Sequence, residues 1–82
     1  MDATPYLFTL TATSPNGWTV AIDATRLYGY FDCPDGSEGG GLWFERIGSR
    51  LRLVDQDGTM CCPRGVILAL RSLRVIVPRS FE

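Results

Sequence analysis

The chain has 82 residues, 45% hydrophobic and 21% charged, with a formal net charge of −1 at pH 7. These values predict one small domain, residues 1–82, with a thin core, and they exclude a disordered chain. The apolar runs fall far short of the roughly 20 residues that cross a bilayer, and MDATPYLFTL lacks the features of a signal peptide, so we expect a cytoplasmic protein of the host cell with no membrane partner.

Two alternating segments near the N-terminus predict a β-hairpin. Residues 5–13 and 18–23 alternate in hydrophobicity and are rich in β-branched and aromatic residues, which is typical of half-buried strands. The turn Ser14-Pro15-Asn16-Gly17 lies between them. Proline presets φ for the first central position of a turn, and glycine accepts the positive φ that closes it.

The next two predicted strands, Leu27–Phe31 and Leu42–Ile47, flank a loop rich in glycine. Residues 33–36 repeat the Pro-x-Gly turn pattern. Residues 37–41 predict a mobile tract, because glycine is costly to order, and their three consecutive glycines suit either a flexible loop or a backbone that passes close to a neighbouring group. Alternation places three aromatic residues on the strand face opposite Leu27, Phe31, Leu42 and Phe44. They are Tyr28, Tyr30 and Trp43.

The last third of the chain predicts a fifth strand, Leu51–Asp55, and one helix, Pro63–Leu73. Proline is favourable at the first helical position, and apolar residues recur at helical spacing after it. Short strands are also expected at 59–61 and 75–77. The fold class is therefore α+β, an antiparallel sheet of about five strands with a C-terminal helix on one face. Its predicted core is Phe8, Leu10, Val20, Ile22, Phe31, Phe44, Leu53, Val66, Ile67, Leu70 and Val75.

The residue types weigh against an enzyme. Without histidine or lysine, the commonest general bases and the Schiff-base nucleophile are missing. Cys33, Cys61 and Cys62 contain no CxxC pair, so we favour buried thiols over a zinc site completed by a carboxylate. Aspartates in the turns are favoured there for their own backbone bonding. We expect no metal, no cofactor and no catalytic residues.

Charge is divided between the two halves of the chain. Residues 1–45 hold six acidic residues and one arginine, a net charge of −5, whereas residues 46–82 hold seven arginines and three acidic residues, a net charge of +4. Such a split predicts a polarised surface. The candidate partner-binding residues are the acidic and aromatic side chains around the glycine-rich loop. They are Asp32, Asp35, Glu38, Glu45, Tyr28, Tyr30 and Trp43.

Two interpretations of these side chains stay open at the level of the sequence. Tyrosine, tryptophan and arginine are favoured at the centres of protein interfaces, and a run of carboxylates suits a basic partner. Alternatively, the helix covers the second face of the sheet, and the acids form a solvated loop. The arginine-rich half would suit nucleic acid, but the sequence pI of about 5.2 weighs against direct nucleic-acid binding.

The pattern YGYFD…EGGGLWFE…LRLVDQDG…CPRGVILAL, over roughly residues 27–73, resembles small uncharacterised proteins of phages and other bacterial mobile elements. In those proteins a GYFE…GGLWFE segment precedes an L…DYDG turn and an LP..V…L helix. This chain has Gln56 in place of the aromatic residue and Cys62 in place of the leucine before the proline. The resemblance implies a category only, that of anti-CRISPR and other anti-defence inhibitors, and it carries over no site residues.

From this we predict a phage or mobile-element inhibitor that binds a bacterial defence complex of the CRISPR–Cas type and blocks it sterically and electrostatically. The alternative is a small nucleic-acid-binding accessory protein that uses the arginine-rich C-terminal half. A third possibility is a structural component of a phage, which would form large homo-oligomers. The oligomeric state is open.

Overall fold

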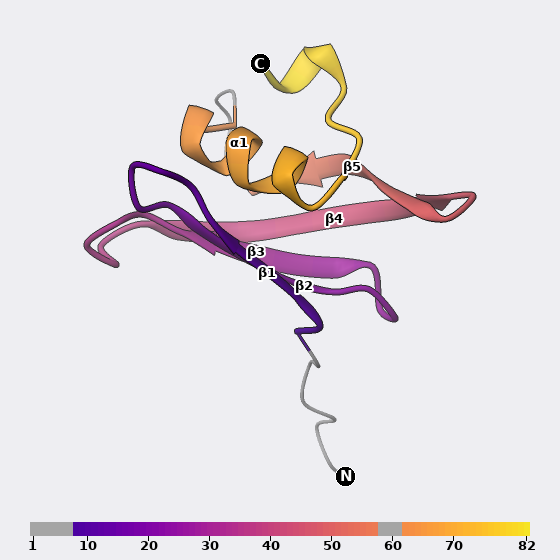
Figure 1. The fold of residues 1–82 in the computed structure, drawn as a ribbon, viewed down its shortest axis with the longest axis horizontal. Helices are drawn as coiled ribbons and strands as arrows, with labels where there is room; N and C mark the ends of the chain where they lie inside the picture. The colour runs from indigo at the N-terminus through magenta and orange to yellow at the C-terminus, as the bar shows by residue number, and fades with distance from the viewer. Residues whose placement is uncertain (1–7, 58–61) are drawn as a thin grey trace, which may run out of the picture.

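The structure is a computed structural model that describes residues 8–57 and 62–82. Its elements in chain order are β1 (Leu10–Thr13), β2 (Thr19–Asp23), β3 (Tyr28–Asp32), β4 (Gly39–Ile47), β5 (Arg50–Gln56), α1 (Arg64–Ser72) and the 3₁₀ helix η1 (Arg79–Phe81). The fold is α+β, as predicted, with one helix packed on a five-stranded antiparallel sheet (Figure 1). Within the described residues, no helix is long and apolar enough to span a membrane.

The sheet is a meander in which each strand pairs with its neighbour in sequence, in the order β1-β2-β3-β4-β5. The turns between β1 and β2 and between β3 and β4 confirm the Pro-x-Gly prediction. Gly17 has φ of +94° and Gly36 has φ of +76°, which are left-handed values that favour glycine. Short turns of this kind keep the strands antiparallel and adjacent.

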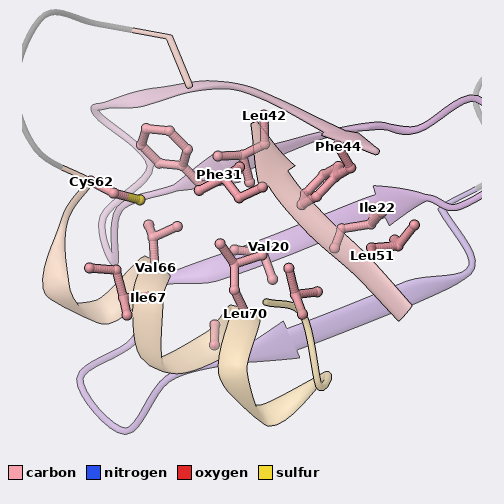
Figure 2. Close-up of a cluster of buried hydrophobic side chains, with 13 residues drawn as sticks. Val20, Ile22, Phe31, Leu42, Phe44, Leu51, Cys62, Val66, Ile67 and Leu70 are labelled. Carbon is pink, nitrogen blue, oxygen red and sulfur yellow. The ribbon is translucent and has the colours of Figure 1, made fainter. Parts of the chain in front are cut away.

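The helix covers one face of the sheet, over β1 and β2 (Figure 1). Alternation turns Val20, Phe31 and Phe44 toward this face, and Val66 and Leu70 of α1 point back at them (Figure 2). The buried apolar core consists of Val20, Ile22, Phe31, Leu42, Phe44, Leu51, Leu53, Cys62, Val66, Ile67, Ala69, Leu70 and Val75. Burying each of the larger side chains contributes roughly 1.5–3 kcal/mol.

Phe8 was predicted to belong to the core, and this prediction is wrong. Its side chain is 37% exposed, and its ring packs against Tyr30 rather than under α1. The reason is that β1 begins only at Leu10, so the alternation that the sequence suggests does not extend back to Phe8. Residues 5–7 of the predicted first strand lie outside the described residues.

Gly65, in the first turn of α1, allows the helix to pack closely on the sheet. A Cβ atom at this position would overlap the ring of Trp18, with Cγ only 2.6 Å away. Trp18 is half-buried and lies near Phe31, with 6.1 Å between ring centroids. Glycine costs a helix about 1 kcal/mol relative to alanine, and the close approach of the Trp18 ring accounts for its presence here.

Of the two interpretations of the three glycines, the mobile tract is wrong, because Gly39–Gly41 form the start of β4 and pair with β3, and the close approach of neighbouring groups is confirmed. Aromatic rings occupy the space that side chains would fill. A Cβ on Gly40 would lie 3.1 Å from the Phe31 ring, and one on Gly41 would lie 2.9 Å from Cη2 of Trp43. Gly40 and Gly41 are therefore strand residues over which aromatic rings fold, as aromatic residues do across glycine in other sheets.

A segment after α1 closes the outer edge of β5. The Ile76 N–H donates to the Leu51 carbonyl at 2.8 Å, and the Leu53 N–H donates to the Ile76 carbonyl at 2.9 Å. The strand predicted at 75–77 is thus reduced to an isolated parallel bridge between Ile76 and Arg52. The short strand predicted at 59–61 lies outside the described residues.

Candidate functional site: the open face and its acidic end

The face of the sheet opposite α1, here called the open face, carries the three predicted aromatic residues. The β-sheet register aligns Tyr28 with Trp43, and Tyr30 with Gly41 on β4 and Ala21 on β2. Tyr30 and Trp43 are 38% and 40% exposed, whereas the residues beside them in the strands are buried. The sequence left open whether the helix covers these rings, and the structure places the helix on the other face.

The aromatic side chains form two edge-to-face pairs. The Tyr28 and Trp43 rings are 5.5 Å apart at 64°, and the Phe8 and Tyr30 rings are 5.1 Å apart at 76°. Such pairs hold each ring in one orientation and contribute about 0.5–1.5 kcal/mol beyond the burial of area. The four residues Phe8, Tyr28, Tyr30 and Trp43 are called the aromatic patch below. Their ordered rings can contact a partner at a low cost in conformational entropy.

Asp55, which is not among the predicted site residues, joins the open face through a β-bulge. Trp43 pairs with Asp55, but the next residue, Phe44, pairs with Leu53, so Val54 is the extra residue on β5. A bulge shifts the alternation by one residue. Asp55 would otherwise share a face with Leu53, which is buried. In the sequence, the apolar alternation of Leu51 and Leu53 breaks at Val54-Asp55, and this break is the signal that could have indicated the bulge.

Acidic side chains gather at one end of the sheet, where β3 and β5 finish and β4 begins. This acidic end consists of Asp32, Asp35, Glu38 and Asp57, and Asp55 lies farther along the sheet, opposite Trp43. Asp32 pairs in register with Gly39, and the Asp57 N–H donates to the Gly41 carbonyl at 2.8 Å, which ties the end of β5 to the start of β4. The structure thus brings three predicted site residues, Asp32, Asp35 and Glu38, beside the aromatic patch.

The turn between β3 and β4 is held in place by Asp35. Its Oδ1 accepts hydrogen bonds from the Cys33 thiol at 2.8 Å, the Ser37 hydroxyl at 2.6 Å and the Ser37 N–H at 2.9 Å. Across the turn, the Cys33 N–H donates to the Glu38 carbonyl at 2.9 Å. These bonds stabilise the charged carboxylate, the thiol bond most and the Ser37 bonds next, and they lower the pKa of Asp35 to about 2.

This geometry predicts the titration of the turn. The Asp35 carboxyl in the folded protein should titrate near pH 2, below its ordinary pKa of 3.8. Because the pKa is lowered, the turn gains stability from Asp35 above the ordinary pKa and loses that gain as the pH falls through about 2. Carboxyl carbon shifts measured by NMR would check this value. In the Cys33→Ala/Ser37→Ala variant the pKa should move back toward the ordinary value, and an unchanged pKa would contradict the assignment.

Glu45, the fourth predicted acidic residue, does not belong to the acidic end. It lies six residues along β4 from Gly39, which is about 20 Å at ~3.3 Å per residue. Its Oε2 accepts a hydrogen bond from Nε of Arg52 at 2.6 Å on the neighbouring strand. This ion pair offsets the charge of Glu45 locally, so the acidic surface consists of the residues at the end of the sheet.

Arginines gather at the opposite end of the sheet, around the β2–β3 and β4–β5 turns. Arg46 donates to the Ala24 carbonyl at 2.8 Å, and Arg50 donates to the Arg74 carbonyl at 2.9 Å. A cavity of about 330 Å³ opens there, lined by Leu10, Ser49, Arg50, Leu51, Leu73, Arg74 and Val75. The polarised surface that the sequence predicts therefore takes the form of two ends of one sheet, the acidic end and this basic end, rather than two faces.

The described residues contain no group of three or more histidine, cysteine or acidic side chains arranged to hold a metal ion. Of the three cysteines, Cys33 is half-buried, Cys62 is buried and Cys61 lies outside the described residues. The arrangement can offer a partner exposed aromatic rings beside fixed negative charge. Comparison of the chain with protein-family models, with curated proteins and with solved structures finds no match.

Proposed function

We propose that this protein is a phage or mobile-element inhibitor that binds a bacterial defence complex of the CRISPR–Cas type through its open face. The observation that carries the proposal is the aromatic patch beside the acidic end, on the face that α1 leaves uncovered. Exposed tyrosine and tryptophan side chains are the residues that contribute most at the centres of protein interfaces. The carboxylates add electrostatic complementarity to a basic partner.

The partner surface that fits this chemistry is one that binds nucleic acid. A CRISPR effector holds its guide–target duplex in a positively charged channel and contacts the backbone phosphates. Asp32, Asp55 and Glu38 would face the arginines and lysines of such a channel, and the rings of Tyr30 and Trp43 would bury against it. Binding there excludes the nucleic acid, so no catalytic step by the inhibitor is required.

The competing function, direct binding of nucleic acid, receives less support from the arrangement of charge. Stacking on bases requires aromatic rings within a positively charged groove. Here the ring of Trp43 lies beside Asp55, and Arg52 on the same face is paired with Glu45. Arg50, at the far end of β5, donates to the Arg74 carbonyl. Arg64 and Arg71 are carried by α1, on the other side of the sheet. The exposed rings are therefore flanked by carboxylates and not by a positively charged groove.

The test is a phage-plating assay in bacterial hosts that carry active CRISPR immunity of each type, with the protein expressed in the host. We expect the wild-type chain to restore plating to the level of a host without CRISPR in at least one of them. Tyr30→Ser/Trp43→Ser should return plating to the immune level. Leu68→Ser is the matched control, because Leu68 on α1 is also 38% exposed but lies away from the open face, and it should leave plating restored.

Two results would overturn the proposal. If the wild-type chain restores plating in none of the hosts, a CRISPR target is wrong. If it restores plating but the double variant does so equally well, the open face is not the binding surface. A pull-down of the tagged protein from nuclease-treated and untreated lysate separates the alternative function, because a partner that depends on nucleic acid disappears after nuclease treatment, whereas a protein target remains.

A further inference from the structure

The strand β1 forms one edge of the sheet, and the adjoining turn determines which of its residues form backbone hydrogen bonds to β2. The Ser14 N–H donates to the Trp18 carbonyl at 2.7 Å, and the β1–β2 register continues from that pair. Residue pairs in an antiparallel ladder alternate between hydrogen-bonded and non-hydrogen-bonded. Leu10 and Ala12 therefore direct their backbone N–H and C=O groups toward β2. The N–H and C=O groups of Thr11 and Thr13 point outward.

The two edge strands of the sheet, β1 and β5, differ in whether another described segment pairs with their outer side. Ile76 pairs with the outer side of β5. No pairing within residues 8–57 and 62–82 uses the outer side of β1. Proteins usually protect an edge with charged residues, proline or a bulge, but β1 is the one strand of the described sheet without a charged residue, and it has neither proline nor bulge.

We propose that two copies of this chain form a two-fold symmetric dimer through antiparallel pairing of their β1 strands, centred on Ala12. Thr11 of each copy then lies opposite Thr13 of the other. Both residues direct N–H and C=O groups toward the partner, so the two pairs form four backbone hydrogen bonds. Their side chains lie on the open face, where threonine pairs across strands are favourable. The two sheets become one, and this proposal is independent of the proposed function.

A second copy is the occupant that the charge distribution favours. β1 runs from Leu10, which lines the cavity of the basic end with Arg50 and Arg74, to Thr13, which lies in line with Asp32 of the acidic end. Antiparallel pairing therefore sets the acidic end of each copy alongside the basic end of the other, which is electrostatically complementary. The net charge of −1 per copy adds little repulsion. Across a two-fold axis, each β1 residue faces the same residue of the other copy or one close to it in sequence. A charged residue there would meet a like charge, and Thr11, Ala12 and Thr13 avoid this because they are uncharged.

The test is the mass of the purified full-length chain, measured by light scattering over a concentration series. We expect the mass to rise from 9.1 kDa toward twice that value as concentration increases. Thr11→Pro should hold it at the monomer value. The backbone N–H of Thr11 is not bonded to β2, and proline is tolerated at an edge position whose N–H points outward. Thr11→Val, which keeps the N–H, is the control and should dimerise as wild type does. Thermal unfolding by circular dichroism checks that each variant is folded.

A charge exchange tests the predicted register. Thr11→Lys/Thr13→Lys places like charges opposite each other across the dimer and should abolish association, whereas Thr11→Lys/Thr13→Glu places opposite charges there and should restore it. In wild type, the amide protons of Thr11 and Thr13 should gain protection from exchange as concentration rises. A wild-type mass that stays at the monomer value at every concentration, or a dimer unaffected by Thr11→Pro, would overturn the proposal.

Discussion

Replacing Gly29 with alanine should lower the free energy of unfolding by about 3 kcal/mol, the upper end of what an added group costs in a packed core. Gly29 lies in the middle of β3, opposite Ile22, with its missing side chain directed at the core. A Cβ atom there would overlap the Ala21 carbonyl oxygen and lie 3.1 Å from the Ile22 Cα. Both are backbone atoms of the paired strand, so neither can move without disturbing the ladder between β2 and β3.

Gly48→Ala is the control for this prediction. Gly48 has φ of +61°, but a Cβ there would meet no atom within 4 Å. The substitution should therefore cost only the left-handed backbone conformation, about 1 kcal/mol. Urea denaturation of the two variants and the wild type measures both effects. Equal losses at the two positions would mean that β2 and β3 are less closely paired around Gly29 than the structure indicates.

The second large effect is expected at Asp23, whose side chain is fully buried. Its Oδ1 accepts hydrogen bonds from the backbone N–H groups of Thr25 at 3.0 Å and Arg26 at 3.1 Å, and its Oδ2 accepts one from the Arg26 guanidinium at 2.7 Å. This carboxylate thus organises the turn between β2 and β3. Asp23→Ala removes the acceptor of these three hydrogen bonds, which should lower the free energy of unfolding by about 2–4 kcal/mol.

Two further variants separate the causes. Asp23→Asn retains an oxygen for the two backbone N–H groups but removes the charge, so it should lose less stability than Asp23→Ala. Glu38→Ala removes an exposed carboxylate with no side-chain bond of this kind, and its effect should stay within about 0.5 kcal/mol. All three are measured by urea denaturation. If Asp23→Ala costs no more than Glu38→Ala, the buried network does not stabilise the turn.

Most of the fold could be predicted from the sequence because its strands obey simple local rules. Alternation around Val20 and Phe31 identified the buried face, and the Pro-x-Gly turns at Gly17 and Gly36 identified the hairpins. The same alternation correctly set Tyr30 and Trp43 on the opposite face. What it could not decide was which face α1 covers, because both faces carry large apolar or aromatic side chains.

The sequence-based prediction and the structure differ where the position of a residue depends on a neighbour that is distant in the sequence. In the sequence, Gly40 and Gly41 resemble a flexible loop, but in the structure they belong to β4, and the rings of Phe31 and Trp43 pack over them. Asp55 joins the site only because Val54 forms a bulge against β4. Glu45 was grouped with the acidic loop by proximity in sequence, whereas an extended strand carries it away and toward Arg52. Cross-strand packing decides each case, and local patterns do not report it.

The order of the elements affects how the chain folds as it is synthesised. Each strand from β2 to β5 pairs with the strand just before it, so every hairpin closes a short loop and can form soon after its second strand emerges, which favours rapid early folding. The helix that covers the apolar side of those strands follows all of them in the chain. Until α1 is made, Val20, Phe31 and Phe44 remain open to water and to other nascent chains. The protein is therefore most prone to aggregation before α1 docks, and variants that slow this docking should lower the soluble yield.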